Sequence, residues 1–116
     1  MSPTAPPMPP DRPSRPLDPI FAPRSIAVIG ASRRRDSIGF ALLHNLVVAE
    51  FSGAIFPVNP QAAAIHSLKC YPAVAAIPDP VDLAVVAVPR DRVQGVVDEC
   101  LAKGVRGLVV ITAGFA

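Results

Sequence analysis

Residues 25–39, SIAVIGASRRRDSIG, decide the fold that this sequence predicts. The first five residues form a short apolar, β-branched run of the kind found in strands that are buried on both faces. The run ends at Gly30, passes through a small and strongly basic loop, and continues from Gly39 into an apolar pattern with helical spacing. A strand, a glycine turn and a helix N-terminus together predict a site for a phosphate-bearing ligand.

Apolar runs recur along the rest of the chain. The runs at residues 54–58, 82–88 and 107–111 predict further strands. Pro57 indicates an edge or irregular position in the first of them, because a proline cannot donate to a sheet ladder. Residues 68–72 predict a short strand on the sheet edge.

Helical stripes separate these runs. Residues 38–49 and 93–101 place apolar side chains at three- and four-residue steps and predict amphipathic helices. Asp36 or Ser37 is the expected N-cap of the first helix and Gly53 lies just past its end, while Lys103–Gly104 is expected to end the second. Residues 61–67 predict a helical or turn segment, and residues 73–76 a short helix.

This alternation of strands and helices indicates the α/β class. We predict a Rossmann-like, doubly wound parallel sheet of about five strands in a single domain. The domain is expected to cover residues 17–116, with Leu17, Ile20 and Phe21 as the first side chains able to dock on a core. Residues 1–16 are rich in proline and predict a disordered leader.

Composition limits the function classes. The net charge of +2 is too small to favour nucleic acid. Cys70 and Cys100 show no metal-ligand spacing, so we expect reduced thiols and no metal site. We find no apolar run long enough to span a membrane and no signal peptide, and therefore expect a cytoplasmic protein.

The fold itself predicts where a ligand binds. Doubly wound sheets bind ligands beyond the carboxyl ends of their strands, where the strand order reverses. The four strand ends are Gly30–Ser32, Val58–Pro60, Val88–Arg90 and Ile111–Gly114, and we expect the site among them.

The glycine spacing within the loop narrows the choice of ligand. No glycine stands between Gly30 and Gly39, so the G-x-G-x-x-G dinucleotide fingerprint is absent, and no acid follows Val58 to hold a ribose. The sequence also has no P-loop and no catalytic or metal-ligand constellation, and His44 and His66 are expected on the surface. An NAD(P)-binding domain whose arginines bind a 2′-phosphate stays an alternative.

The loop carries three consecutive arginines, Arg33, Arg34 and Arg35, between Ser32 and Ser37. Arginine binds phosphate well because its planar fork of donors is always charged. We expect at least one of the three to contact phosphate, the alternative being a solvated cluster. Replacing all three by alanine is then expected to weaken binding, by about 1–3 kcal/mol for each buried charged hydrogen bond lost.

Five blocks in order carry a resemblance to a known family. They are residues 23–32 (PRSIAVIGAS), 58–60 (VNP), 69–72 (KCYP), 81–85 with 88–89 (VDLAV and VP) and 111–115 (ITAGF). Together they resemble the CoA-binding domain of the NDP-forming (ADP-forming) acyl-CoA synthetases, which are relatives of the succinyl-CoA synthetase α subunit. The same module occurs at the front of some protein lysine acetyltransferases.

The resemblance implies that CoA or acyl-CoA lies across the strand ends. Its phosphates would meet Gly30, Ala31, Ser32 and the loop that follows, with Arg33, Arg34, Arg35, Ser37 and Gly39 as further candidates. Val58, Asn59, Pro60, Val88, Pro89 and Arg90 would flank the nucleotide and pantetheine, and Ile111, Thr112 and Ala113 would line the approach of the thiol arm. The sequence departs from the family pattern at Gln61, where a lysine is frequent, and at Ser67, which replaces a common glycine.

The resemblance also limits what the chain can do. In the synthetases a second domain supplies a phosphohistidine and an ATP-grasp module supplies the nucleotide chemistry, and His44 and His66 match no phosphohistidine motif. We therefore expect a CoA-binding module that catalyses nothing alone, whose parent is an ADP-forming acid–CoA ligase and whose partner is an ATP-grasp domain or subunit. Alternatives are the regulatory CoA-binding domain of a lysine acetyltransferase and a subunit that docks on such a partner without binding a ligand.

Overall fold

The structure, a computed structural model, describes residues 18–111, so the expected leader, Leu17, Thr112 and Ala113 lie outside the described residues. Its elements follow in the order α1 (Asp18–Phe21), β1 (Ser25–Ile29), α2 (Ile38–Val48), β2 (Ala54–Val58), β3 (Ala64–Ile65), β4 (Leu68–Lys69), the 3₁₀ helix η1 (Val74–Ala76), β5 (Leu83–Val86), α3 (Arg90–Lys103) and β6 (Gly107–Val110).

Four of the strands form one parallel sheet in the order β2-β1-β5-β6. All five residues of β1 are buried, as the apolar run that follows Ser25 predicts for a strand inside a parallel sheet. The α/β class and the parallel sheet are confirmed. The count of about five strands is corrected to four, because β3 and β4 pair with each other in a separate antiparallel hairpin.

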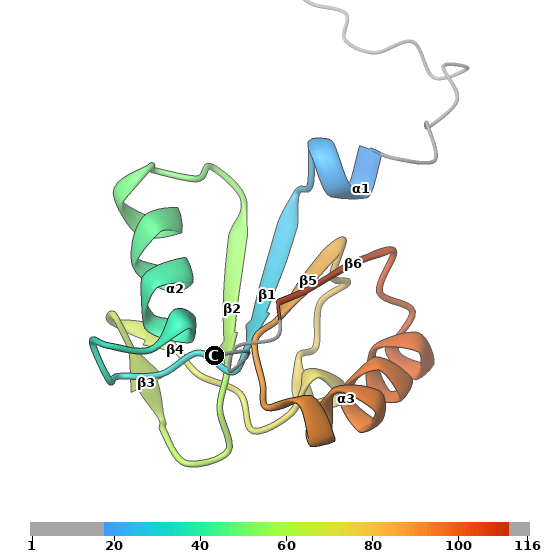
Figure 1. Ribbon diagram of the computed structural model, residues 1–116. Coiled ribbons are helices and arrows are strands. Elements are labelled where there is room, and N and C mark those ends of the chain that lie inside the picture. The colour runs from blue at the N-terminus through green and yellow to red at the C-terminus, as the bar shows by residue number, and fades with distance from the viewer. Residues whose placement is uncertain (1–17, 112–116) are drawn as a thin grey trace, which may run out of the picture.

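The two long helices cover opposite faces of this sheet (Figure 1). Alternate residues of β1 show the division. Ala27 packs in the cluster that includes Cys100 of α3, whereas Val28 packs with Leu43 of α2. The sheet is therefore wound on both faces, as predicted. It also separates the two cysteines, since Cys70 belongs to the cluster of α2, and both thiols are free.

Pro57 fits in the sheet because β2 is an edge strand. Pro57 is paired with Val28 of β1 on one side only, so its missing N–H leaves no ladder bond unmade. On the outer side Tyr71 forms a single parallel bridge to Val58. The sequence predicts that residues 68–72 form a strand on this edge of the sheet. Of these residues, only Tyr71 bridges to β2, while Leu68–Lys69 form β4 of the separate hairpin.

The segment between β2 and η1 differs from its prediction. The alanines at 62–64 are good helix formers, yet residues 64–69 form the hairpin β3–β4. Its two-residue turn, His66–Ser67, has φ angles of 58° and 65°. Left-handed φ at both turn residues matches the twist of a tight hairpin. The helical interpretation is wrong, while the turn at its end and the short helix near residues 73–76 are confirmed.

The helix ends follow the expected chemistry with one exception. Ser37 caps α2, and Gly104 ends α3 with a φ of 89°. After α2, however, the left-handed residue is Glu50 with a φ of 59°. Gly53 serves a different purpose, because a Cβ there would lie 2.2 Å from the carbonyl oxygen of Arg24.

The start of the domain also departs from expectation. Pro19 is the buried residue of α1, while Phe21 is 76% exposed and Ile20 lies at the surface. A four-residue helix has too few turns to turn every apolar side chain inward.

Candidate functional site

A cavity of about 350 Å³ opens at the carboxyl ends of β1, β2 and β5. The chain passes from β1 to β2 on one side and returns to β5 on the other, so the strand order reverses at this point. Ligands of doubly wound sheets bind at such reversals, and about 300–1,000 Å³ is the usual size of a small-molecule site. The cavity is lined by Ile29, Gly30, Ala31, Ser32, Val58, Asn59, Pro60, Gln61, Pro72, Ala73, Ala87, Val88, Pro89, Arg92, Val96 and Glu99.

Two glycines allow close backbone contacts next to the cavity. Gly30 has a φ of 98°, and a Cβ there would lie 2.2 Å from the carbonyl oxygen of Ala87, at the end of β5. A Cβ on Gly39 would lie 1.9 Å from the carbonyl oxygen of Gly30. The glycine turn, the first turn of α2 and the end of β5 are therefore in direct backbone contact, which only glycine permits.

Asn59 ties the two neighbouring turns together. Its Nδ2 donates to the carbonyl oxygen of Ala31 at 2.8 Å, and its Oδ1 accepts from the backbone N–H of Gln61 at 2.7 Å. One amide side chain thus holds the turn after β1 against the turn after β2.

The opposite wall comes from α3. Arg92, Val96 and Glu99 lie four and three residues apart, so they share one face of the helix. The strand-end rule also did not include five other lining residues, which are Ile29, Gln61, Pro72, Ala73 and Ala87. The three- and four-residue spacing is visible in the sequence, but which helix face meets the strand ends is set by packing.

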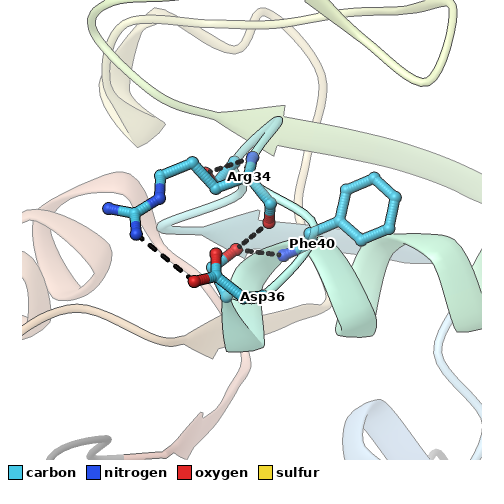
Figure 2. Close-up of polar contacts among 5 residues, drawn as sticks. Arg34, Asp36 and Phe40 are labelled. Atoms are coloured by element: carbon cyan, nitrogen blue, oxygen red, sulfur yellow. Dashed lines mark hydrogen bonds and ion pairs between the residues drawn. The ribbon is translucent and has the colours of Figure 1, made fainter.

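The three loop arginines do not line the cavity and contact protein groups instead. The Nε of Arg33 donates to the carbonyl oxygen of Ala64 at 3.2 Å, and the guanidinium of Arg35 lies 5.7 Å from the ring centre of Phe40. Arg34 forms an exposed ion pair with Asp36 at 3.4 Å, as Figure 2 shows. All three side chains are exposed.

Figure 2 also shows how the loop enters α2. The Oγ of Ser37 donates to the carbonyl oxygen of Arg34 at 2.7 Å and accepts from the backbone N–H of Phe40 at 3.1 Å. The hydroxyl is thereby used in capping the helix.

The seventeen candidate residues therefore separate into three groups. Those that line the cavity are Gly30, Ala31, Ser32, Val58, Asn59, Pro60, Val88 and Pro89. Those that the structure describes outside its lining are Arg33, Arg34, Arg35, Ser37, Gly39, Arg90 and Ile111. Thr112 and Ala113 lie outside the described residues.

The titratable groups of the described residues add no nucleophile to the cavity. Burial raises the pKa of the Cys70 and Cys100 thiols, so both stay protonated near neutral pH. His44 and His66 are exposed and lie outside the lining, with Nδ1 of the first 3.0 Å from Nε2 of the second.

Two further features concern residues 18–111. None of the helices in this range is both long and apolar enough to cross a membrane. Nor does this range bring together three or more His, Cys, Asp or Glu side chains that could hold a metal ion.

A glycine turn and a cavity at the reversal of a parallel sheet define a nucleotide-binding domain of the Rossmann kind. Comparison with known proteins gives the family. The chain belongs to the CoA-binding domain family, whose profile matches residues 24–115. CoA is therefore its cofactor, which decides between the ligands that the loop spacing left open.

The relatives include whole enzymes. An ADP-forming acetate–CoA ligase of Archaeoglobus fulgidus is 48% identical over 97 residues, which are 84% of this chain and 14% of the ligase. The structure of an acetyl-coenzyme A synthetase of Ca. Korarchaeum cryptofilum, solved with phosphate and ADP, matches with a TM-score of 0.82 and 48% identity. That match covers 85% of this chain and 21% of the other. The chain thus spans about a seventh of the first relative and about a fifth of the second.

A third relative is of similar size to this chain. A conserved hypothetical protein of Pyrococcus furiosus matches with a TM-score of 0.69 and 33% identity, over 76% of this chain and 74% of the other. The family therefore includes chains in which this domain makes up most of the length.

Proposed function

We propose that this domain binds CoA in the cavity at the ends of β1, β2 and β5, as the CoA-binding part of an ADP-forming acid–CoA ligase. The observation that carries the proposal is the cavity itself. It lies where the fold binds ligands, and eight of the candidate residues line it in a chain that belongs to a CoA-binding family.

The lining supports one placement of the ligand. The CoA phosphates would lie against Gly30, Ala31 and Ser32, where the backbone comes close enough for only glycine to fit. The nucleotide and pantetheine would lie between Asn59–Pro60 and Val88–Pro89, which line the cavity and follow β2 and β5, the strands on either side of β1. The resemblance implies that the thiol arm would leave past Ile111, which lies outside the lining.

The chemistry of the ligase would come from other parts of that enzyme. The side chains with polar atoms that line the cavity within residues 18–111 are Ser32, Asn59, Gln61, Arg92 and Glu99, and they form no nucleophile–base pair. An ATP-grasp domain or subunit would activate the acid. The free, buried thiols support a cytoplasmic location.

Calorimetric titration with CoA, dephospho-CoA and NADH tests the ligand. We expect CoA to bind more tightly than NADH. Tighter binding of NADH, or no heat with CoA at millimolar concentration, would contradict the proposal.

A substitution inside the cavity tests the location. Ala73→Trp places a large ring among the lining residues and is expected to lower CoA affinity at least tenfold. Ala76→Trp is the matched control, since Ala76 is exposed and outside the lining. The chain has no native tryptophan, so each variant carries a single fluorophore whose emission reports folding and ligand contact. Equal affinity in the two variants would place CoA elsewhere.

A further inference from the structure

CoA carries three phosphate groups, and a cavity that holds them needs positive charge. Among the described residues that line the cavity, only Arg92 is a cation. The loop arginines do not fill this need, because Arg33 and Arg35 contact other protein groups and Arg34 is paired with Asp36.

The guanidinium of Arg92 is free for a ligand. Its backbone N–H donates to Pro89, but its side chain makes no hydrogen bond or ion pair with another residue in the range 18–111. It lies in the first turn of α3, next to Val88 and Pro89 at the end of β5. This is the end of the helix where the backbone N–H groups also favour an anion.

The other charge in the lining lies further along the same helix. Glu99 is seven residues beyond Arg92, which corresponds to about 10 Å along the helix axis. Asp91 lines a neighbouring shallow depression with Arg92 and Glu99, and it does not line the cavity. The cavity is therefore positive at the strand ends and negative towards the C-terminal half of α3.

We propose that Arg92 binds a phosphate group of CoA, and that Glu99 repels phosphate from the other end of the cavity, so that CoA enters in one direction. This inference rests on the proposed function. It moves the side-chain phosphate contact from the loop before α2 to the first turn of α3. A guanidinium paired with phosphate forms strong, charge-assisted hydrogen bonds, whereas a carboxylate beside phosphate is unfavourable.

The test compares affinities for CoA, dephospho-CoA and pantetheine in five forms of the protein. They are the wild type, Arg92→Ala, Arg92→Lys, Glu99→Gln and the triple variant Arg33→Ala/Arg34→Ala/Arg35→Ala. We expect Arg92→Ala to weaken CoA binding about 10- to 100-fold, the usual effect of losing a hydrogen bond to a charged group. Arg92→Lys should recover part of this, and the triple variant should stay within about threefold of the wild type.

Further readouts separate a phosphate contact from a structural effect. Pantetheine, which has no phosphate, should bind equally to the wild type and Arg92→Ala. Glu99→Gln should bind CoA as tightly as the wild type or more tightly. Raising the salt concentration should weaken CoA binding less in Arg92→Ala than in the wild type. Dephospho-CoA identifies the group: an undiminished Arg92→Ala effect assigns the diphosphate, and a lost effect assigns the 3′-phosphate.

Several results would overturn the inference while leaving the proposed function intact. These are wild-type CoA affinity in Arg92→Ala, an equal loss for pantetheine, a larger loss in the triple arginine variant, or a tenfold loss in Glu99→Gln. A wild-type protein that does not bind CoA would overturn the proposed function and the inference together.

Discussion

Helices α2 and α3 both begin at the carboxyl edge of the sheet, but they meet the cavity in different ways. The first turn of α2 packs directly against other parts of the protein. Gly39 lies against the carbonyl group of Gly30, and Ser37 caps the helix. The start of α3 has no side-chain cap, and its Arg92 faces the cavity. Backbone contacts on the α2 side therefore shape the cavity, while side chains on the α3 side supply its charge.

The largest effect is expected at the backbone contact of α2. Gly39→Ala would place a Cβ 1.9 Å from a carbonyl oxygen that belongs to the backbone and cannot turn aside. We expect a loss of about 3 kcal/mol or more in the free energy of unfolding. Urea denaturation followed by circular dichroism measures it.

The control lies on α3. A Cβ on Gly95 meets nothing within 4 Å, so Gly95→Ala should stabilise the protein by about 1 kcal/mol through helix propensity. Similar effects at both glycines would remove the contrast between the two helices.

The next effect is expected at Asn59, which joins the two turns on the α2 side. Asn59→Ala removes two hydrogen bonds and leaves the carbonyl oxygen of Ala31 without this donor. We expect a loss of about 2 kcal/mol in the free energy of unfolding, together with weaker CoA binding. Asn45→Ala is the control, since Asn45 is exposed on α2 and favours the helix less than alanine does. A change at Asn59 no larger than at Asn45 would show that the turns hold without the amide.

A smaller effect is expected from the cap of α2. Ser37→Ala removes the acceptor for the Phe40 N–H and should cost about 1 kcal/mol in thermal or urea denaturation. Ser52→Ala, at an exposed position, serves as the reference. If the Ser37→Ala and Ser52→Ala variants had equal denaturation midpoints, the capping hydrogen bond would contribute nothing to stability.

The smallest effect is expected in the hairpin, away from the cavity. Ser67 has a φ of 65°, a conformation that costs an ordinary residue about 1 kcal/mol relative to glycine. Ser67→Gly should therefore raise the melting temperature by a few degrees and leave CoA binding unchanged. A lower melting temperature in Ser67→Gly would mean that contacts of the serine side chain offset the cost of its left-handed backbone.

The site was predictable from the sequence where neighbouring residues determine the geometry. The strand from Ser25 to Ile29, the turn at Gly30 and the cap at Ser37 lie within one short stretch, and all three are found as expected. The turns after β2 and β5 were also predictable, because parallel strands end at the same edge of a sheet.

The remaining features depend on contacts between distant residues. The alanines before His66 favour a helix, but the pairing of Ala64 with Lys69 selects a hairpin. In the same way, Arg33 contacts Ala64, which is 31 residues further along the chain. The position of Arg92 depends on how α3 lies on the sheet. None of these three features can be predicted from the sequence of its own segment.

Asn59 has one further consequence, which concerns the entropy of binding. The amide fixes the turns after β1 and β2 against each other before any ligand arrives. The freedom of these two backbone segments is thus lost during folding and is not lost again when CoA binds. More of the contact energy with the cofactor then appears as affinity, because the protein does not have to reorganise to receive it.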